Sequence, residues 1–252
     1  MHGAFIRKDF GDGVTGISLN RAPVNALSVG FLQDFASLLD ELTGDETVRA
    51  LVLLSEFKVF SAGIDLKEAM AFSVEEQAAM VDALNTTFLR LFAFPKPVVA
   101  AINGAAIAGG MFFVLTSDFR VAGPHASFGL AEIRVGVDFP IGPMEFARAT
   151  LSPDMLRRLM LTGRPISAQE AHLAGVVDVI EQDPDVVLDR AIRAARDMAA
   201  SPPDTYAVIK HQIRQATITQ IESAMAAGTA SREAGWFTES TQDAMMRVLG
   251  GI

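Results

Sequence analysis

The chain has 252 residues, half of them apolar, which is enough for one large α/β domain with a buried core. Its 30 acidic and 21 basic residues give a formal net charge of −9, so neither nucleic acid nor a membrane surface is an expected partner. Cysteine is absent, which excludes disulfide scaffolds, thiolate zinc sites and cysteine nucleophiles. Without a leader-like start or an apolar run of about 18 residues, a cytoplasmic globular protein is expected.

The first half of the chain predicts alternating strands and helices. Two short strands, 5–10 and 14–20, are joined at Gly11-Asp12-Gly13, because Asp-Gly is a strong hairpin signal. Ser28 is a suitable N-cap for an amphipathic helix over 29–42. The elements expected next are a strand over 48–54, a helix over 74–92, a strand over 98–102, a short apolar helix over 108–117 and a strand over 119–122.

The order of these elements predicts a parallel sheet with helices packed on it. The run 48–54 is nearly all apolar, which is typical of a strand covered on both faces. Pro202-Pro203 marks the expected boundary between an α/β core, residues 1–200, and a helical C-terminal region, residues 201–252. Beyond Ser152 the helices expected are 153–161, 168–173, 186–200 and three stretches between 204 and 249.

Three common catalytic patterns are absent or fail their structural context. Gly11, Gly13 and Gly16 match the dinucleotide-binding spacing, but a strand follows them where that site needs a helix, so we interpret them as a hairpin. The four histidines have no zinc-binding spacing, and no GxSxG nucleophile elbow occurs. Neither a nicotinamide site nor a metal site is predicted.

Two glycine-containing segments, 60–66 and 102–112, each follow a buried strand directly and lead into a helix. Turns at the carboxyl ends of parallel strands line the crevice in which α/β sheets bind ligands. Free N–H groups at a helix start attract negative oxygen, so two such turns facing each other would hold one oxyanion. The alternative is that the glycines serve only the shape of ordinary strand-to-helix turns.

Taken together, several segments resemble the crotonase superfamily, also called the enoyl-CoA hydratase/isomerase superfamily. The resemblance covers roughly residues 5–180, and its motifs occur in the expected order. They are 19–28 (LNRAPVNALS), 60–66 (FSAGIDL), 102–110 (INGAAIAGG), 128–132 (FGLAE), 162–171 (TGRPISAQEA) and 175–178 (GVVD).

The resemblance implies a spiral of ββα units, a helical C-terminal trimerisation region, and a homo-oligomer that is either a trimer or a dimer of trimers. It implies an acyl-CoA thioester as the ligand, with CoA part of the substrate and no metal or redox cofactor. The oxyanion hole of the family, mapped onto this chain, uses the backbone N–H groups of Ile64 and Gly109. The residues that would line the CoA channel are Asn25, Ala26, Leu27, Ala62, Gly63, Asp65 and Leu66.

The acidic residues indicate which reaction the resemblance implies. Hydratases of the family have two glutamates that share the addition of water. This chain has Phe112 at the first of these positions and Glu132 at the second. A single carboxylate is similar to the pattern of the Δ3,Δ2-enoyl-CoA isomerase branch, in which one base moves a proton between two carbons. The alternative for Glu132 is a surface salt bridge with Arg134, and for Phe112 a core position facing away from the site.

The segment after Glu132 departs from the family pattern. Residues 136–143 (GVDFPIGP) replace the usual Pro-Gly-x-Gly-Gly turn. Asp138 or Glu145 is therefore a candidate second acid, with a solvated loop carboxylate as the alternative. Dienoyl-CoA isomerase, a hydratase with an atypical acid, and a non-catalytic acyl-CoA binding protein stay open as alternatives to the isomerase.

Overall fold

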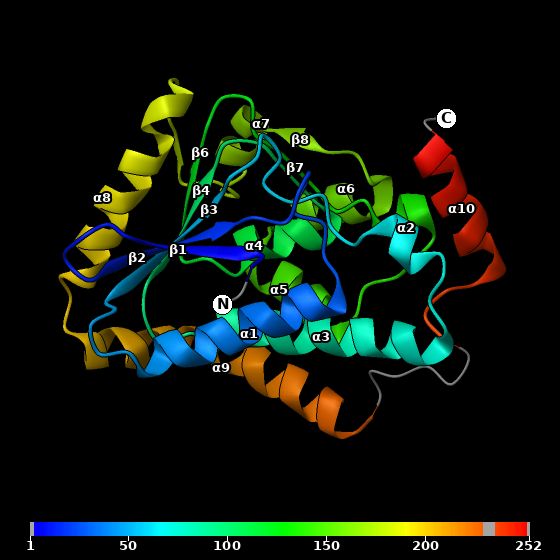
Figure 1. The fold of residues 1–252 in the computed structure, drawn as a ribbon, viewed down its shortest axis with the longest axis horizontal. Helices are drawn as coiled ribbons and strands as arrows, with labels where there is room; N and C mark the ends of the chain where they lie inside the picture. Colours follow the sequence, from blue (N-terminus) through cyan, green and yellow to red (C-terminus); the bar gives the residue numbers. More distant parts are fainter. Residues whose placement is uncertain (1–2, 229–234, 251–252) are drawn as a thin grey trace.

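The computed structural model describes residues 3–228 and 235–250, which form two sheets surrounded by helices (Figure 1). The larger sheet has the strand order β1-β2-β3-β4-β6-β9, and the smaller has the order β5-β7-β8. The strands of the larger sheet are β1 (Phe5–Asp9), β2 (Val14–Leu19), β3 (Ala50–Ser55), β4 (Val98–Ile102), β6 (Phe119–Ala122) and β9 (Val179–Ile180). Those of the smaller sheet are β5 (Ala105–Ile107), β7 (Ser127–Gly129) and β8 (Ile166–Ser167).

Most connections between strands contain a helix. The α-helices are α1 (Val29–Gly44), α2 (Leu66–Ala69), α3 (Val74–Phe92), α4 (Met111–Leu115), α5 (Ile141–Thr150), α6 (Pro153–Thr162), α7 (Ala168–Leu173), α8 (Val187–Ala199), α9 (Pro203–Ala226) and α10 (Glu239–Gly250). Three short 3₁₀ turns are η1 (Ala108–Gly110), η2 (Glu132–Val135) and η3 (Pro184–Val186). In the described part of the chain, no helix combines the length and apolar character needed to span a membrane.

The β1-β2 hairpin is confirmed, and with it the interpretation of the glycine pattern. The two strands run antiparallel with Phe5 opposite Leu19, and Gly16 lies within β2 opposite Lys8. Gly11, Asp12 and Gly13 in the turn have φ values of 76°, 55° and 75°. These left-handed conformations suit Gly and Asp, and no helix begins there to hold a pyrophosphate.

The parallel core is also confirmed. Strands β2, β3, β4, β6 and β9 pair in parallel. Side chains alternate along β3: Leu51 and Leu53 join the core under α1 and α3, while Ala50, Val52 and Leu54 join the core under α8. The sheet is therefore covered on both faces, which explains why its central strands β3 and β4 are almost wholly apolar.

Several predicted boundaries needed correction. The segment 108–117 is not one helix, because η1 precedes the short α4. The short strands β5, β7, β8 and β9 were not predicted, since two or three residues give too little periodicity to detect. Between 204 and 249 the described residues form two helices rather than three stretches, and part of that range, 229–234, lies outside the described residues.

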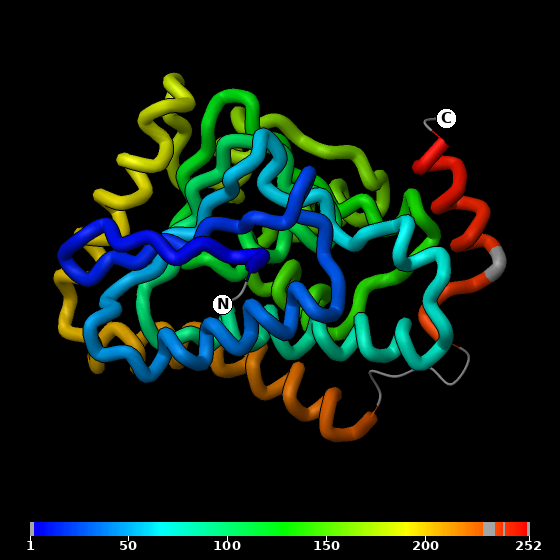
Figure 2. The backbone as a smooth tube through the Cα atoms, in the orientation of Figure 1, coloured from blue at the N-terminus to red at the C-terminus, as the bar shows by residue number. Residues whose placement is uncertain are grey.

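The C-terminal helices pack onto the core at two different places. Asp118, just before β6, forms ion pairs with Lys210 at 2.6 Å and Arg214 at 2.8 Å, which fixes α9 near the start of β4 and β6. All three side chains are nearly buried, so each charge depends on the others. Figure 2 shows the chain then reaching α10 on the side of the molecule where α2 lies.

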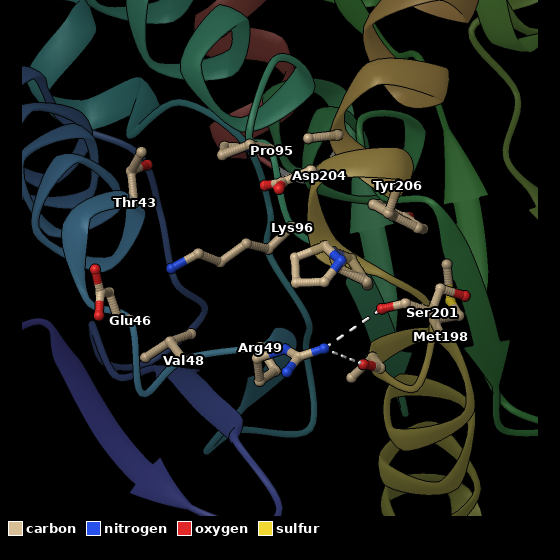
Figure 3. A pocket seen from close by; sticks show the side chains of 14 residues that line it. Thr43, Glu46, Val48, Arg49, Pro95, Lys96, Met198, Ser201, Asp204 and Tyr206 are labelled. Atoms are coloured by element: carbon tan, nitrogen blue, oxygen red, sulfur yellow. Dashed lines mark hydrogen bonds between the residues drawn. The ribbon is translucent and has the colours of Figure 1, made fainter.

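A cavity of about 360 Å³ lies at the amino ends of β3 and β4 (Figure 3). Lys96 donates hydrogen bonds to the carbonyl oxygens of Leu42 at 2.7 Å and Asp45 at 2.8 Å, at the end of α1. Arg49 donates to the carbonyl of Ala199, the last residue of α8, at 2.9 Å. Both cations therefore satisfy carbonyl groups at helix C-termini, where the helix dipole is negative. The cavity is thus a structural junction of helix ends.

Lys96→Met tests this structural role, because methionine keeps the apolar stem and removes the charged donor. We expect the free energy of unfolding to fall by about 1–3 kcal/mol, the range for losing hydrogen bonds from a charged group. The measurement is urea denaturation, with the exposed Lys58→Met as the matched control, expected to change stability by less than about 0.5 kcal/mol. Equal stability of the two variants would contradict the role given to Lys96.

Candidate active site

Two loops meet at the carboxyl ends of β3 and β4. Ser61 pairs in parallel with Ala106, and the Ile107 amide donates to the Ser61 carbonyl at 3.0 Å. Leu27 forms a parallel bridge with Ile64 on the other side. The bridge at Ser61 continues the pairing of the smaller sheet beyond β5. Together these bonds hold the loop after β3 directly against the turn that begins α4.

The backbone amides of Ile64 and Gly109 lie next to each other in this contact. A methyl group placed on Gly63 would lie 3.0 Å from the Gly109 amide nitrogen and 2.9 Å from the Cβ of Ala108. A methyl group placed on Gly109 would lie 3.9 Å from the Ile64 nitrogen. Gly63 also has a φ of 83°, so only glycine fits this position without strain. Within the described residues, neither the Ile64 nor the Gly109 amide donates to a protein acceptor.

A cavity of about 140 Å³ opens beside these two amides. Its wall is apolar apart from one carboxylate, that of Glu132. The described residues that line it are Ala62, Ile64, Leu66, Leu84, Ile107, Ala108, Gly109, Phe112, Ala131, Glu132, Val135, Val137, Pro140, Pro143, Trp236, Phe237, Met245 and Val248. Six of the residues predicted from the sequence are therefore brought together here: Ala62, Ile64, Leu66, Gly109, Phe112 and Glu132.

Glu132 is buried in the cavity wall at the start of η2, which follows β7. Its side-chain Oε2 has no hydrogen-bond partner among the described residues, so the predicted alternative of a salt bridge with Arg134 does not occur. Burial raises the pKa of this carboxyl to about 8, against a usual value of 4.5. A buried carboxyl group that has one oxygen without a partner and is basic near neutral pH has the properties of a general acid–base group.

Phe112 faces the cavity and does not point away from it. Its ring is 1% exposed and lies 5.8 Å from the ring of Phe88. The neighbouring Phe113 points instead into the core, where its ring contacts those of Phe35 and Phe88. The expected position of Phe112, one helical turn beyond Gly109, is therefore correct.

Five residues expected to line a CoA channel do not line this cavity. Asn25 is fully buried, and its side chain donates to the Phe60 carbonyl at 2.9 Å and to Ser55. Asp65 caps α2 and pairs with Arg21. With Ala26, Leu27 and Gly63, these residues brace the loop that carries the Ile64 amide. They support that loop and do not belong to the lining of the cavity beside Glu132.

The two candidate second acids also lie away from the cavity wall. Asp138 is exposed, as the alternative of a solvated loop carboxylate predicted, and its Oδ1 accepts a hydrogen bond from Trp236 Nε1 at 3.0 Å. Glu145 is buried in α5 but pairs with Arg148. Glu132 is thus the only carboxylate on the wall formed by the described residues.

Sequence reasoning missed the side of the cavity formed by the end of the chain. Trp236, Phe237, Met245 and Val248 lie more than a hundred residues from Glu132. Trp236 is the only tryptophan in the sequence and is nearly buried. A lone tryptophan near an amphipathic helix was an available signal, but it did not show which surface the helix covers.

Comparison with known proteins supports the family indicated by this geometry. The model of the enoyl-CoA hydratase/isomerase family matches residues 9–247. A probable enoyl-CoA hydratase of Bacillus subtilis is 30% identical over 77% of this chain and 76% of that protein. The 2,3-dehydroadipyl-CoA hydratase of Escherichia coli is 31% identical over 83% of this chain and 82% of that protein. Human mitochondrial Δ3-Δ2-enoyl-CoA isomerase has a similar structure, with a TM-score of 0.92, 28% identity, and coverage of 98% and 97%.

The fold is therefore the crotonase fold, in which two adjoining sheets and helices form a spiral of ββα units. The chain belongs to the enoyl-CoA hydratase/isomerase family. Its acidic pattern and its structural similarity to the human isomerase agree with the branch indicated by the sequence.

The raised pKa of Glu132 predicts how the stability of the folded protein changes with pH, which can be measured without an activity assay. Below pH 4.5 the carboxyl is protonated in both folded and unfolded chains; between pH 4.5 and about 8 it ionises only in the unfolded chain, which favours unfolding. As pH rises through this window, the free energy of unfolding of the wild type should therefore fall relative to that of Glu132→Gln, by about 1.4 kcal/mol for each pH unit. Urea titrations of both proteins at several pH values measure the difference; a pH-independent difference would show an unperturbed carboxyl.

Proposed function

We propose that this protein is an enoyl-CoA isomerase that moves a double bond of an acyl-CoA from the β,γ to the α,β position. The observation that carries the proposal is a cavity in which, among the described residues, Glu132 is the one carboxylate and shares an apolar wall with the Ile64 and Gly109 amides, which donate to no acceptor there. One base and one oxyanion site are the groups that a proton shift next to a thioester requires.

In the proposed reaction, the thioester oxygen accepts hydrogen bonds from the Ile64 and Gly109 amides. The Glu132 carboxylate takes a proton from Cα, and the electron pair of that C–H bond moves onto the thioester oxygen to form a dienolate. The amides stabilise the negative charge as it develops. Glu132 then returns the proton to Cγ, the carbonyl re-forms, and the double bond lies between Cα and Cβ. The enzyme ends in its starting state, and no metal or redox cofactor is consumed.

The apolar wall supports both halves of this mechanism. Desolvation keeps Glu132 basic, and the buried surroundings strengthen the interaction of the amides with the oxyanion. The ring of Phe112 occupies the position where hydratases of the family have their other glutamate. A phenyl ring neither holds nor deprotonates a water molecule, so isomerisation is favoured over hydration.

Hydration is the second candidate, because the Bacillus subtilis and Escherichia coli relatives are both named as hydratases. It would require a second group to activate water. Asp138 would have to leave its hydrogen bond with Trp236 to reach the cavity, which makes it a weaker candidate than Glu132.

A homo-oligomer, a trimer or a dimer of trimers, is part of the proposal. The support is a set of large apolar side chains on α9 that remain exposed in the single chain: Val208, Ile209 and Ile213. Such a surface is unusual in a monomer and is typical of an interface.

Glu132→Gln keeps the size of the side chain and removes the base. We expect turnover of 3-enoyl-CoA to fall by at least ~10²-fold, with nearly unchanged affinity for acyl-CoA. In the wild type, kcat/KM should increase about tenfold per pH unit and level off above about pH 8, because only ionised Glu132 accepts the proton. Stopped-flow or steady-state assays across pH measure both. Turnover of the variant at the wild-type rate would remove Glu132 from the mechanism.

Phe112→Glu tests the choice of reaction. The wild type should isomerise 3-enoyl-CoA much faster than it hydrates 2-enoyl-CoA, and the variant should shift that ratio toward hydration. Burying a second carboxylate costs stability, so total activity is expected to fall. Parallel assays of both substrates give the ratio, and Phe112→Leu is the control that keeps the position apolar. Efficient hydration by the wild type would contradict the isomerase proposal.

A further inference from the structure

We infer that the cavity accepts a wholly apolar acyl group of about six carbons, and that Trp236 sets this limit. The inference deepens the proposed function and rests on it, since it assumes that the acyl group of a CoA thioester occupies the cavity beside Glu132. Three observations support the inference: the volume of the cavity, the contacts that hold Trp236 in its wall, and the apolar character of the residues that line it.

The size of the cavity gives the number of carbons. Its volume is about 140 Å³. In another protein, an apolar cavity of about 150 Å³ binds benzene, which has six carbon atoms. The thioester carbon and the three carbons that react take most of this space. Two further methylene or methyl groups then fill it.

The wall contributed by Trp236 is held at several points. The backbone amides of Trp236 and Phe237 both donate to Gln77 Oε1 at 2.8 Å, and Gln77 is buried on α3. The indole Nε1–H donates to the carbonyl oxygen of Asp138 at 3.1 Å and to its Oδ1 at 3.0 Å. A longer acyl chain would have to displace a buried indole and break these bonds, whereas a shorter chain leaves part of the cavity empty.

Further contacts hold the segment around Trp236 in place. The rings of Trp236 and Phe237 lie 5.3 Å apart, and the ring of Phe237 stacks on that of Phe72 at 6.4 Å. Thr241 at the start of α10 donates to the carbonyl of Gly136, next to η2, at 2.8 Å. The wall is thus tied to α3, to the loop after Glu132 and to the segment leading into α3. This makes it a fixed limit for the acyl chain.

The chemistry of the wall excludes polar acyl ends. Among the described residues that line the cavity there is no basic side chain, and Glu132 is the one charged or ionisable group. An acyl group that ends in a carboxylate would bury that charge without a partner. In this respect we expect the chain to differ from its Escherichia coli relative, which is named for 2,3-dehydroadipyl-CoA, an acyl group with a terminal carboxylate.

The test uses saturated acyl-CoA esters, because they bind without reacting. Calorimetric titration of the wild type should show hexanoyl-CoA binding about fifteenfold more tightly than butyryl-CoA, since each of the two extra buried methylenes is worth about fourfold in affinity. Decanoyl-CoA should bind about tenfold more weakly than hexanoyl-CoA, the cost of forcing extra methylenes into a filled cavity. Adipyl-CoA, with the same six carbons and a terminal carboxylate, should bind about 10²-fold more weakly than hexanoyl-CoA.

Two variants separate the bulk of the indole from its hydrogen bond. Trp236→Ala should bring the affinity for decanoyl-CoA to within about threefold of that for hexanoyl-CoA, because it removes the end of the cavity. Trp236→Phe keeps an aromatic ring and loses the Nε1–H, so it should keep a preference for hexanoyl-CoA, though a smaller one. Circular dichroism establishes that each variant is folded, and the wild-type series decides the size limit by itself if Trp236→Ala is not.

The outcomes separate this inference from the proposed reaction. Equal or tighter binding of decanoyl-CoA or adipyl-CoA by the wild type would overturn the inference while leaving isomerisation of short substrates intact. An unchanged chain-length profile in a folded Trp236→Ala would remove Trp236 as the limit. Conversely, a wild type that shows the expected binding series but does not isomerise 3-hexenoyl-CoA would keep the size limit and overturn the proposed reaction.

Discussion

The close approach of two backbone segments, 61–65 and 107–110, is the constraint on which the site depends. Side chains would separate them, because a Cβ on Gly63 or Gly110 would lie within about 3 Å of backbone atoms of the other segment. Ala108 accepts a φ of 50° so that the chain can turn here, a conformation that costs free energy outside glycine. The surrounding parallel bridges hold it in place. The fold thus gives up some stability to keep two amide groups side by side, neither of which donates to an acceptor in the described part of the chain.

The charged groups that stabilise the fold and the carboxyl group proposed to react lie at opposite ends of the parallel strands. The amino ends of β3 and β4 contain Lys96 and Arg49, whose charges are used by helix termini, and Asp118 binds α9 through paired cations. At the carboxyl ends the described residues of the wall are otherwise apolar, and Oε2 of Glu132 has no hydrogen-bond partner among them. The same kind of group therefore stabilises the protein where it is paired and becomes a base where it is not.

Sequence periodicity predicted the main strands and helices, and sequence motifs predicted the residues at the centre of the site. Apolar strands such as 98–102 and the capped helix 74–92 have strong local signals, and both were predicted at their observed bounds. Glycine turns after buried strands indicated the two loops, and the resemblance to the family assigned the oxyanion donors to the amides of Ile64 and Gly109. The wall around Trp236 and the role of Asp138 depend on contacts between distant parts of the chain, such as Trp236 with Gln77. Local patterns do not encode such contacts, so the sequence left Asp138 as either a second acid or a solvated loop carboxylate and did not predict that it accepts a hydrogen bond from the indole.

The use of backbone amides has a consequence for how such a protein changes during evolution. Every residue except proline carries an N–H, so substitution of the side chain at Ile64 leaves the oxyanion donor in place. Gly63 has no such freedom, because its neighbours leave no room for a Cβ. Tolerance and intolerance to mutation therefore alternate between adjacent positions of one loop. The reactive groups on the facing wall, by contrast, are ordinary side chains that a single codon change replaces. A lineage with this backbone can exchange one acyl-CoA reaction for another while the machinery that stabilises the charged intermediate is inherited unchanged.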